Sequence, residues 1–236
     1  MKNFPLILST VAVILAAVAL INSYKTQVQS VNTESVAAAL KESPKMIVEA
    51  MDIYQKQQQE EALAEREKAL ETVNNADGLP FVGPEDASVT VVEFFDFSCG
   101  YCKRLAPSIE KLIADNADVK FVFKPVSFVA PISRPLAQAA IAAHKQGKYV
   151  EFYKAVFEHE GRVTEADIDT IAQSLNMNVD QFKKDMNSAE TKQTLGNVLE
   201  LMQKLQIGGV PTLFVNKKSV QSISADEIQE VINSSK

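Results

Sequence analysis

At 236 residues the chain has room for one or two domains and a sizeable buried core. Its composition, 46% hydrophobic and 23% charged, is that of a globular protein. A formal net charge of −6 and the lack of a Lys/Arg cluster argue against a nucleic-acid partner.

The N-terminal segment is strongly apolar, because residues 4–21, after Lys2, carry no charge. Such a run predicts either a signal peptide within residues 1–24 or a single membrane anchor. Small residues at 17–19 fit a cleavage site and favour removal, whereas the length of the run suits a bilayer span. In both cases the positive end stays inside and we expect the rest of the chain to be exported.

Residues 34–73 are predicted to be helical, with Pro44 starting a second helix. A helix with an apolar stripe and no domain around it is typical of chains that pack against each other. We therefore expect the arm, residues 25–73, to form a homo-oligomer; the alternative is that it folds back on its own domain. The stripe has spacings of three, four and seven: Val36, Leu40, Ile47, Met51 and Tyr54.

The remainder alternates strands and helices after a segment rich in Gly, Pro, Asn and Asp, residues 74–88, which predicts a linker and the start of the core. This order predicts an α/β domain over residues 79–236 with a helical insertion at about 133–206. The expected elements are a strand at 88–97, a helix at 100–117, a strand at 118–128, a hairpin at 211–224 turning at Lys217–Lys218, and a helix at 225–235.

Cys99 and Cys102 are the two cysteines of the chain, separated by Gly100 and Tyr101. They lie where the first strand meets the following helix, and the free N–H groups and dipole of a helix start favour a thiolate at Cys99. Cys102 lies one turn later on the same face and is less exposed. The pair predicts thiol–disulfide exchange, in which Cys99 attacks and Cys102 resolves the mixed disulfide, with no further cofactor.

Two other uses of the cysteines are less consistent with the sequence. A disulfide across so small a loop adds little stability. Zinc requires four ligands, and the two histidines, His144 and His159, fall fifteen residues apart on the helical insertion. We therefore expect no metal, although a lone cysteine pair can hold Cu(I).

Three further residues bear on the site. Glu93 lies in a strand expected to be buried, where an acid costs desolvation, so we expect a raised pKa and proton exchange with Cys102; the alternative is a solvated edge. Asp96, nearer the strand end, is expected to cap or to be solvated. Pro211 opens a strand, and a cis bond there would turn the Val210 backbone toward an extended substrate, although an isolated proline is more often trans.

The stretch VVEFFDFSCGYCKR, followed after a helical insertion by GGVPTLFV, resembles the DsbA family of exported thiol:disulfide oxidoreductases. The resemblance covers residue 79 to the end, and the arm is similar to that of ScsC-like members, whose arms assemble oligomers. It implies a thioredoxin fold with an inserted helical domain. It also makes Cys99 the attacking thiol, Cys102 the resolving thiol, Glu93 a buried proton relay and Pro211 a cis proline, with Val210 beside it at the substrate-binding position.

The sequence gives conflicting indications of whether the enzyme oxidises client thiols or isomerises client disulfides. DsbA itself has Pro-His between its cysteines, whereas Gly100–Tyr101 resembles the isomerase DsbC and Val210 looks like DsbA. The resemblance implies a periplasmic enzyme that acts on cysteines of exported proteins and has a membrane redox partner. We favour isomerase over oxidase, with a non-catalytic chaperone or copper-binding module as a further alternative.

Overall fold

The structure is a computed structural model that describes residues 16–20, 22 and 33–236. Within the chain two compact units are distinguished, Met1–Glu60 and Glu61–Lys236. In the part of the chain that the structure describes, no helix has the length and apolarity needed to cross a membrane. The predicted leader or anchor at residues 4–21 lies largely outside the described residues.

The first unit holds α2 (Thr33–Glu42) and the larger part of α3 (Lys45–Thr72). The two helices are separated at Ser43 and Pro44, as the sequence predicts, because proline suits the start of a helix and disfavours its interior. The apolar stripe of α3 is solvent-exposed in the single chain. Its side chains Ile47, Met51 and Tyr54 are 45%, 55% and 62% exposed, and the apolar Met46, Val48 and Ile53 on other sides of the helix are also exposed.

The second unit is built on a five-stranded sheet with the order β1-β3-β2-β4-β5. Strands β2 and β3 run parallel, and the other neighbouring strands are antiparallel. Both central strands are buried along their whole length, because helices cover both faces of the sheet. The strands are β1 (Phe81–Val82), β2 (Thr90–Phe95), β3 (Lys120–Pro125), β4 (Thr212–Val215) and β5 (Lys218–Val220).

Alternating side chains of β2 serve two separate cores. Val91 and Phe95 face one core, to which α4 (Gly100–Asp115), α6 (Tyr149–Glu158) and α10 (Ala225–Asn233) contribute. Val92 and Phe94 face the other, formed with residues from the end of α3 and from α9 (Ala189–Lys204). Successive residues of β2 and β3 therefore point to opposite faces of the sheet and pack into different cores.

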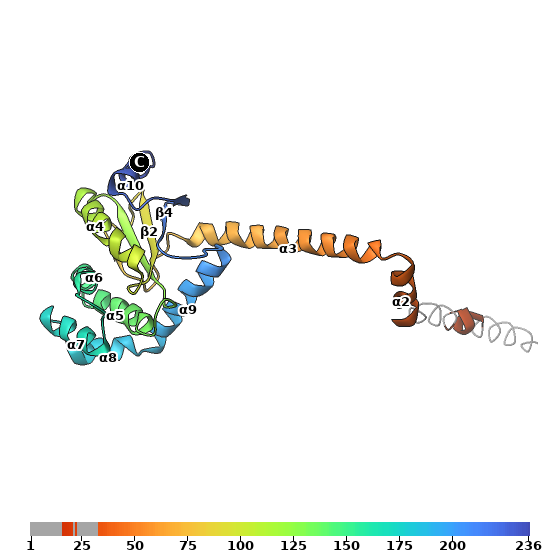
Figure 1. Cartoon of the computed structure of the whole chain (residues 1–236), viewed down its shortest axis with the longest axis horizontal. Coiled ribbons are helices and arrows are strands. Elements are labelled where there is room, and N and C mark those ends of the chain that lie inside the picture. The colour runs from red at the N-terminus through yellow and green to blue at the C-terminus, as the bar shows by residue number, and fades with distance from the viewer. Residues whose placement is uncertain (1–15, 21, 23–32) are drawn as a thin grey trace, which may run out of the picture. The chain divides into compact units, whose positions relative to one another are not determined.

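The helical insertion runs from Ser133 to Lys204, close to the predicted 133–206. Figure 1 shows α5 to α8 gathered beyond the sheet, with α9 leading back toward β4. The insertion comprises α5 (Ser133–Lys145), α6, α7 (Glu165–Ser174), α8 (Val179–Met186) and α9. The α/β order with inserted helices is as expected from the sequence.

The structure differs from the sequence prediction at two places. The segment 74–88 contains the edge strand β1, where Phe81 pairs with Val122, and its Leu79 is buried. The hairpin turn predicted at Lys217–Lys218 is wrong by one residue, since β4 ends at Val215 and β5 begins at Lys218. Asn216 takes the first turn position with a φ of 54°, a conformation that asparagine tolerates well.

Candidate active site

Cys99 and Cys102 flank the start of α4, as their spacing predicts. Cys99 is the N-cap residue in extended conformation, and its N–H donates to the Asp96 carbonyl at 2.9 Å. Its side chain is half-buried, whereas Cys102, in the first turn, is fully buried. One sulfur is therefore accessible to a second molecule and the other is not.

The loop before β4 meets Cys99 from the other side. The Val210–Pro211 peptide is cis, so the trans alternative is excluded. The Cys99 thiol donates to the Val210 carbonyl oxygen at 3.4 Å. Residues more than a hundred positions apart in sequence thus form one site.

The environment of Cys102 keeps its thiol protonated. Burial raises its pKa above the ordinary range, and the negative charge of Glu93 and a hydrogen bond with Cys99 act in the same direction. A hydrogen bond from the Asp96 backbone opposes this shift. Cys102 therefore needs a proton acceptor before it can attack another sulfur.

Glu93 is the titratable carboxyl whose charge acts on Cys102. Its side chain is buried, which excludes the solvated-edge alternative. Burial raises its pKa from 4.5 to about 8, and a hydrogen bond donated by the Tyr153 hydroxyl at 3.1 Å partly offsets the shift. A carboxyl that changes its protonation state near neutral pH thus lies within electrostatic range of the resolving thiol.

Asp96 directly follows β2 and is fully buried, which excludes the solvated alternative, whereas its contact with the turn before α4 agrees with the capping alternative. Its carboxylate accepts hydrogen bonds from the Ser98 N–H and the Ser133 hydroxyl, at 2.8 and 2.7 Å. Sequence reasoning missed Tyr153 and Ser133 altogether. They lie 60 and 37 residues from their carboxylate partners, and no local pattern marks them.

Exposed apolar side chains surround the accessible sulfur. Tyr101 is 61% exposed, with the Arg104 guanidinium 4.0 Å from its ring centroid, and Phe128 is 53% exposed. A cavity of about 260 Å³ lies beside the cis proline, lined by Tyr101 and by residues 210–213 and 220–223. Gly100 is open, since a Cβ there would meet no atom within 4 Å.

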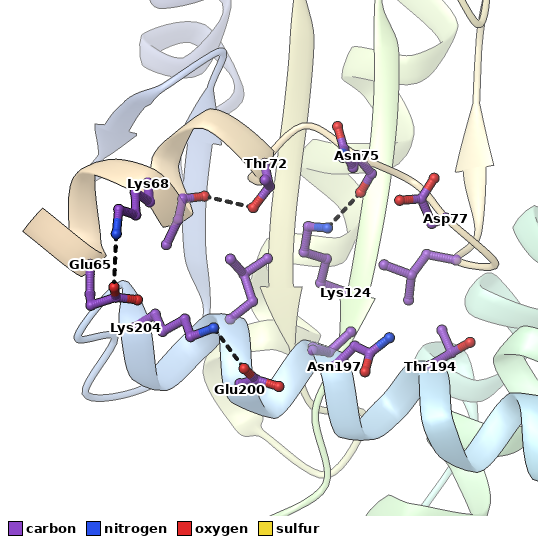
Figure 2. A pocket seen from close by; sticks show the side chains of 14 residues that line it. Glu65, Lys68, Thr72, Asn75, Asp77, Lys124, Thr194, Asn197, Glu200 and Lys204 are labelled. Atoms are coloured by element: carbon purple, nitrogen blue, oxygen red, sulfur yellow. Dashed lines mark hydrogen bonds and ion pairs between the residues drawn. The ribbon is translucent and has the colours of Figure 1, made fainter.

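A buried lysine lies on the opposite face of the sheet. Lys124 of β3 lines a cavity of about 440 Å³ between the end of α3 and α9, and its amino group donates to the Asn75 carbonyl at 2.7 Å (Figure 2). Burial lowers its pKa from 10.5 to about 8, although the negative charge of Asp77 opposes the shift. Nothing in the sequence pattern marked this lysine.

Metal ligands do not gather around the cysteines. Within residues 16–20, 22 and 33–236, no group of three or more His, Cys, Asp or Glu side chains is arranged to hold a metal ion. His144 lies against the Phe81 ring, and His159 ends α6 near Asp167. The two histidines have separate surroundings.

Comparison with known proteins places this site in a family. A family model described as Thioredoxin matches residues 75–234. Disulfide bond formation protein D of Bacillus subtilis is 32% identical over 168 residues, which cover 66% of this chain and 76% of that protein. The catalytic domain of Proteus mirabilis ScsC superposes with a TM-score of 0.63 at 27% identity, covering 74% of this chain and 97% of that one.

Matches to much longer proteins also occur. The Na(+)/H(+) antiporter NhaA 3 of Salinispora tropica is 31% identical over 136 residues, which cover 57% of this chain. This chain spans only 21% of that protein's length. The similarity therefore concerns one domain of such a protein.

Proposed function

The chain belongs to the thioredoxin family, in its DsbA-like group of thiol:disulfide oxidoreductases, and from that premise we propose that it catalyses thiol–disulfide exchange on cysteines of exported proteins. The observation that carries the proposal is the pairing of two unlike thiols. Half-buried Cys99 starts α4 against the Val210 carbonyl, and Cys102 is buried one turn later. The name of the Bacillus subtilis relative, disulfide bond formation protein D, refers to the same chemistry.

The steps follow from the positions of the groups. The Cys99 thiolate attacks a client disulfide, one new S–S bond forms, and the displaced client sulfur leaves as a thiolate that takes up a proton. Cys102 then gives its proton to the Glu93 carboxylate and attacks the Cys99 sulfur. The client leaves as a dithiol and the Cys99–Cys102 disulfide forms. In an isomerisation, a client thiol attacks the mixed disulfide first and returns Cys99 as a thiolate.

Catalysis is tested by removing the attacking sulfur. We expect Cys99→Ala to abolish the recovery of activity from a scrambled disulfide substrate such as ribonuclease, while circular dichroism shows an intact fold. Cys102→Ala is the matched variant, and we expect it to accumulate mixed disulfides with the client that are visible on a non-reducing gel. Undiminished recovery by Cys99→Ala would leave only a chaperone or copper-binding role.

For the direction of the reaction we propose isomerase over oxidase. The support is Gly100–Tyr101 in place of a histidine-containing dipeptide, and an arm suited to bringing several sites together. Only ~30 mV of reduction potential corresponds to ~1.4 kcal/mol, so a few interactions with the thiolate decide the direction. A lower potential makes the pair a weaker oxidant of client thiols, and reshuffling then requires a redox partner that keeps Cys99 reduced.

An oxidase is the second candidate, because the Bacillus relative is named for disulfide bond formation and Val210 precedes the cis proline. The equilibrium of the Cys99–Cys102 pair with glutathione separates the two. A potential near the ~−120 mV of DsbA would reject the isomerase assignment. The double variant Gly100→Pro, Tyr101→His gives a comparison, since proline suits the first position of a helix, and we expect it to move the potential upward.

Self-association through residues 34–73 is part of the proposal, supported by the exposed stripe of α3. We expect Ile47→Glu with Met51→Glu to lower the mass measured by light scattering. Lys45→Gln with Lys56→Gln changes the net charge by the same amount at exposed positions on the opposite side of the helix, and it should leave the mass unchanged. A monomeric mass for the unaltered protein would dismiss the arm's role.

We also propose that the protein works in the periplasm, either freed by signal cleavage or anchored by residues 4–21, and that a membrane redox partner reoxidises or reduces its dithiol. The apolar N-terminal run supports export. Mass spectrometry of the protein recovered from the envelope fraction tests the two forms. Recovery in the cytoplasm with an intact N-terminus would contradict both.

A further inference from the structure

Asp96 joins three segments that meet at the cysteines. It directly follows β2 and is fully buried. Its Oδ1 accepts from the Ser98 N–H and the Ser133 hydroxyl, and its Oδ2 accepts from the N–H groups of Phe128 and Val129 at 3.2 and 3.1 Å. Four donors on one carboxylate bind the turn before Cys99, the loop after β3 and the first residue of α5.

The main chain of the same residue contacts both cysteines. Its carbonyl accepts from the Cys99 N–H at 2.9 Å, and its backbone forms the hydrogen bond with Cys102 that opposes the rise of that thiol's pKa. A movement of Asp96 would therefore change the hydrogen bonds of Cys99 and Cys102 at the same time. The side chain determines where this stretch of main chain lies.

Sheet pairing does not replace these contacts. The last bond between β2 and β3 runs from the Val126 N–H to the Phe95 carbonyl at 2.8 Å, so Ser98 and the loop from residue 127 to 132 lie beyond the ladder. The Ser133 hydroxyl also accepts from the Ala130 N–H at 3.0 Å and contacts the Ser98 hydroxyl at 3.1 Å. Without the carboxylate, the N–H groups of Ser98, Phe128 and Val129 would lose their acceptor, and the two loops that carry them would no longer be held together.

We propose that Asp96 is the positioning residue of the exchange reaction: its carboxylate holds the turn that carries Cys99 against the loop 127–132 and so fixes the geometry of the dithiol. This inference rests on the proposed function. It acts through Ser98, Phe128 and Val129 rather than by contact with a client. It also explains why a buried carboxylate directly follows β2.

The test compares Asp96→Asn with the unaltered protein in two measurements. One is the pH profile of alkylation of reduced Cys99 by iodoacetamide, and the other is the equilibrium constant with glutathione. Asparagine keeps the volume of the side chain but turns an NH2 group toward N–H donors. We therefore expect the alkylation rate of Cys99 at a fixed pH and the equilibrium constant with glutathione each to change by about tenfold. Ser133→Ala removes one donor and should change both in the same direction by less.

Asn116→Ala is the matched control. Asn116 ends the same helix, α4, and its buried amide donates to the Leu112 carbonyl and to Gln229. We expect it to lower the urea midpoint while leaving both measurements within about twofold, because it does not touch the cysteine turn. Equal changes in Asn116→Ala and Asp96→Asn would reduce Asp96 to a general stabilising residue and overturn the proposal.

The outcomes separate the two proposals. A folded Asp96→Asn with an unchanged alkylation profile and an unchanged equilibrium constant overturns the role of Asp96, while the exchange activity stands. Failure of the unaltered protein to exchange with glutathione overturns the proposed function and, with it, this role in exchange. If Asp96→Asn does not fold, Ser133→Ala is judged by the same two measurements.

Discussion

Glu93 and Lys124 are two buried charged residues on neighbouring strands that serve opposite faces of one sheet. Phe94, next to Glu93, pairs with Lys124 in the parallel register of β2 and β3. Burial moves both pKa values to about 8, upward from 4.5 for the acid and downward from 10.5 for the amine. The desolvation physics is the same for both residues.

Their partners make the difference. Glu93 receives a hydrogen bond from Tyr153 and interacts electrostatically with Cys102. Lys124 donates to a backbone carbonyl at the start of the core and lines a cavity without a thiol (Figure 2). A shifted pKa alone therefore does not identify a catalytic group; the groups that face it do.

The largest expected effect is on stability, and it has opposite signs for the two residues. Below pH 4.5 Glu93 is protonated in both folded and unfolded chains. Between 4.5 and about 8 only the unfolded chain loses the proton, so the free energy of unfolding falls by about 1.4 kcal/mol per pH unit. Between about 8 and 10.5 only the folded chain has lost the Lys124 proton, so the free energy of unfolding rises.

Urea unfolding of the reduced protein from pH 4 to 11 measures both effects. We expect Glu93→Gln to lack the fall and Lys124→Met to lack the rise. When each variant's curve is subtracted from that of the unaltered protein, the difference curve should therefore show the contribution of that residue alone. The subtraction cancels the titration of groups common to both. A difference curve that is flat for either residue would show that its folded pKa is unshifted.

The next effect separates the two residues by activity. We expect Glu93→Gln to slow the release of mixed disulfides about tenfold, because Cys102 loses its proton acceptor and the amide cannot replace it. Lys124→Met should leave this rate within about twofold, since Lys124 lies on the other face. Single-turnover kinetics with a labelled glutathione disulfide measure the step, and equal slowing in both variants would abolish the distinction between the faces.

The sequence predicted most of the architecture because alternation, glycine and proline are local signals. Strands β2 and β3, helix α4 and the break at Pro44 come from such patterns. The cysteine pair and Glu93 could also be predicted from the sequence. The two cysteines are marked by their spacing, and Glu93 is a charged residue in a strand that is otherwise expected to be buried. The edge strand β1 could not be predicted, because its two residues acquire their structure only by pairing with Val122 and Phe121.

The parts of the site that escaped prediction depend on tertiary contacts. Tyr153 and Ser133 reach the carboxylates from the helical insertion, and only the fold brings them near. Asp96 has the same appearance in sequence whether it is solvated or accepts four hydrogen bonds. Lys124 alternates with apolar neighbours in β3, and whether its face is covered depends on α3 and α9.

The smallest effect tests how the surroundings set the protonation of Glu93. The Tyr153 hydroxyl lowers the pKa of Glu93 against burial, so Tyr153→Phe should raise it by about one unit beyond 8. The pH at which the free energy of unfolding stops falling should increase by the same amount. Tyr149, one turn earlier in α6, is the matched control: its buried hydroxyl has no hydrogen-bond partner among the described residues. Tyr149→Phe should leave that pH unchanged, and an equal shift in the two variants would show that bulk burial alone, rather than the Tyr153 hydrogen bond, sets the pKa.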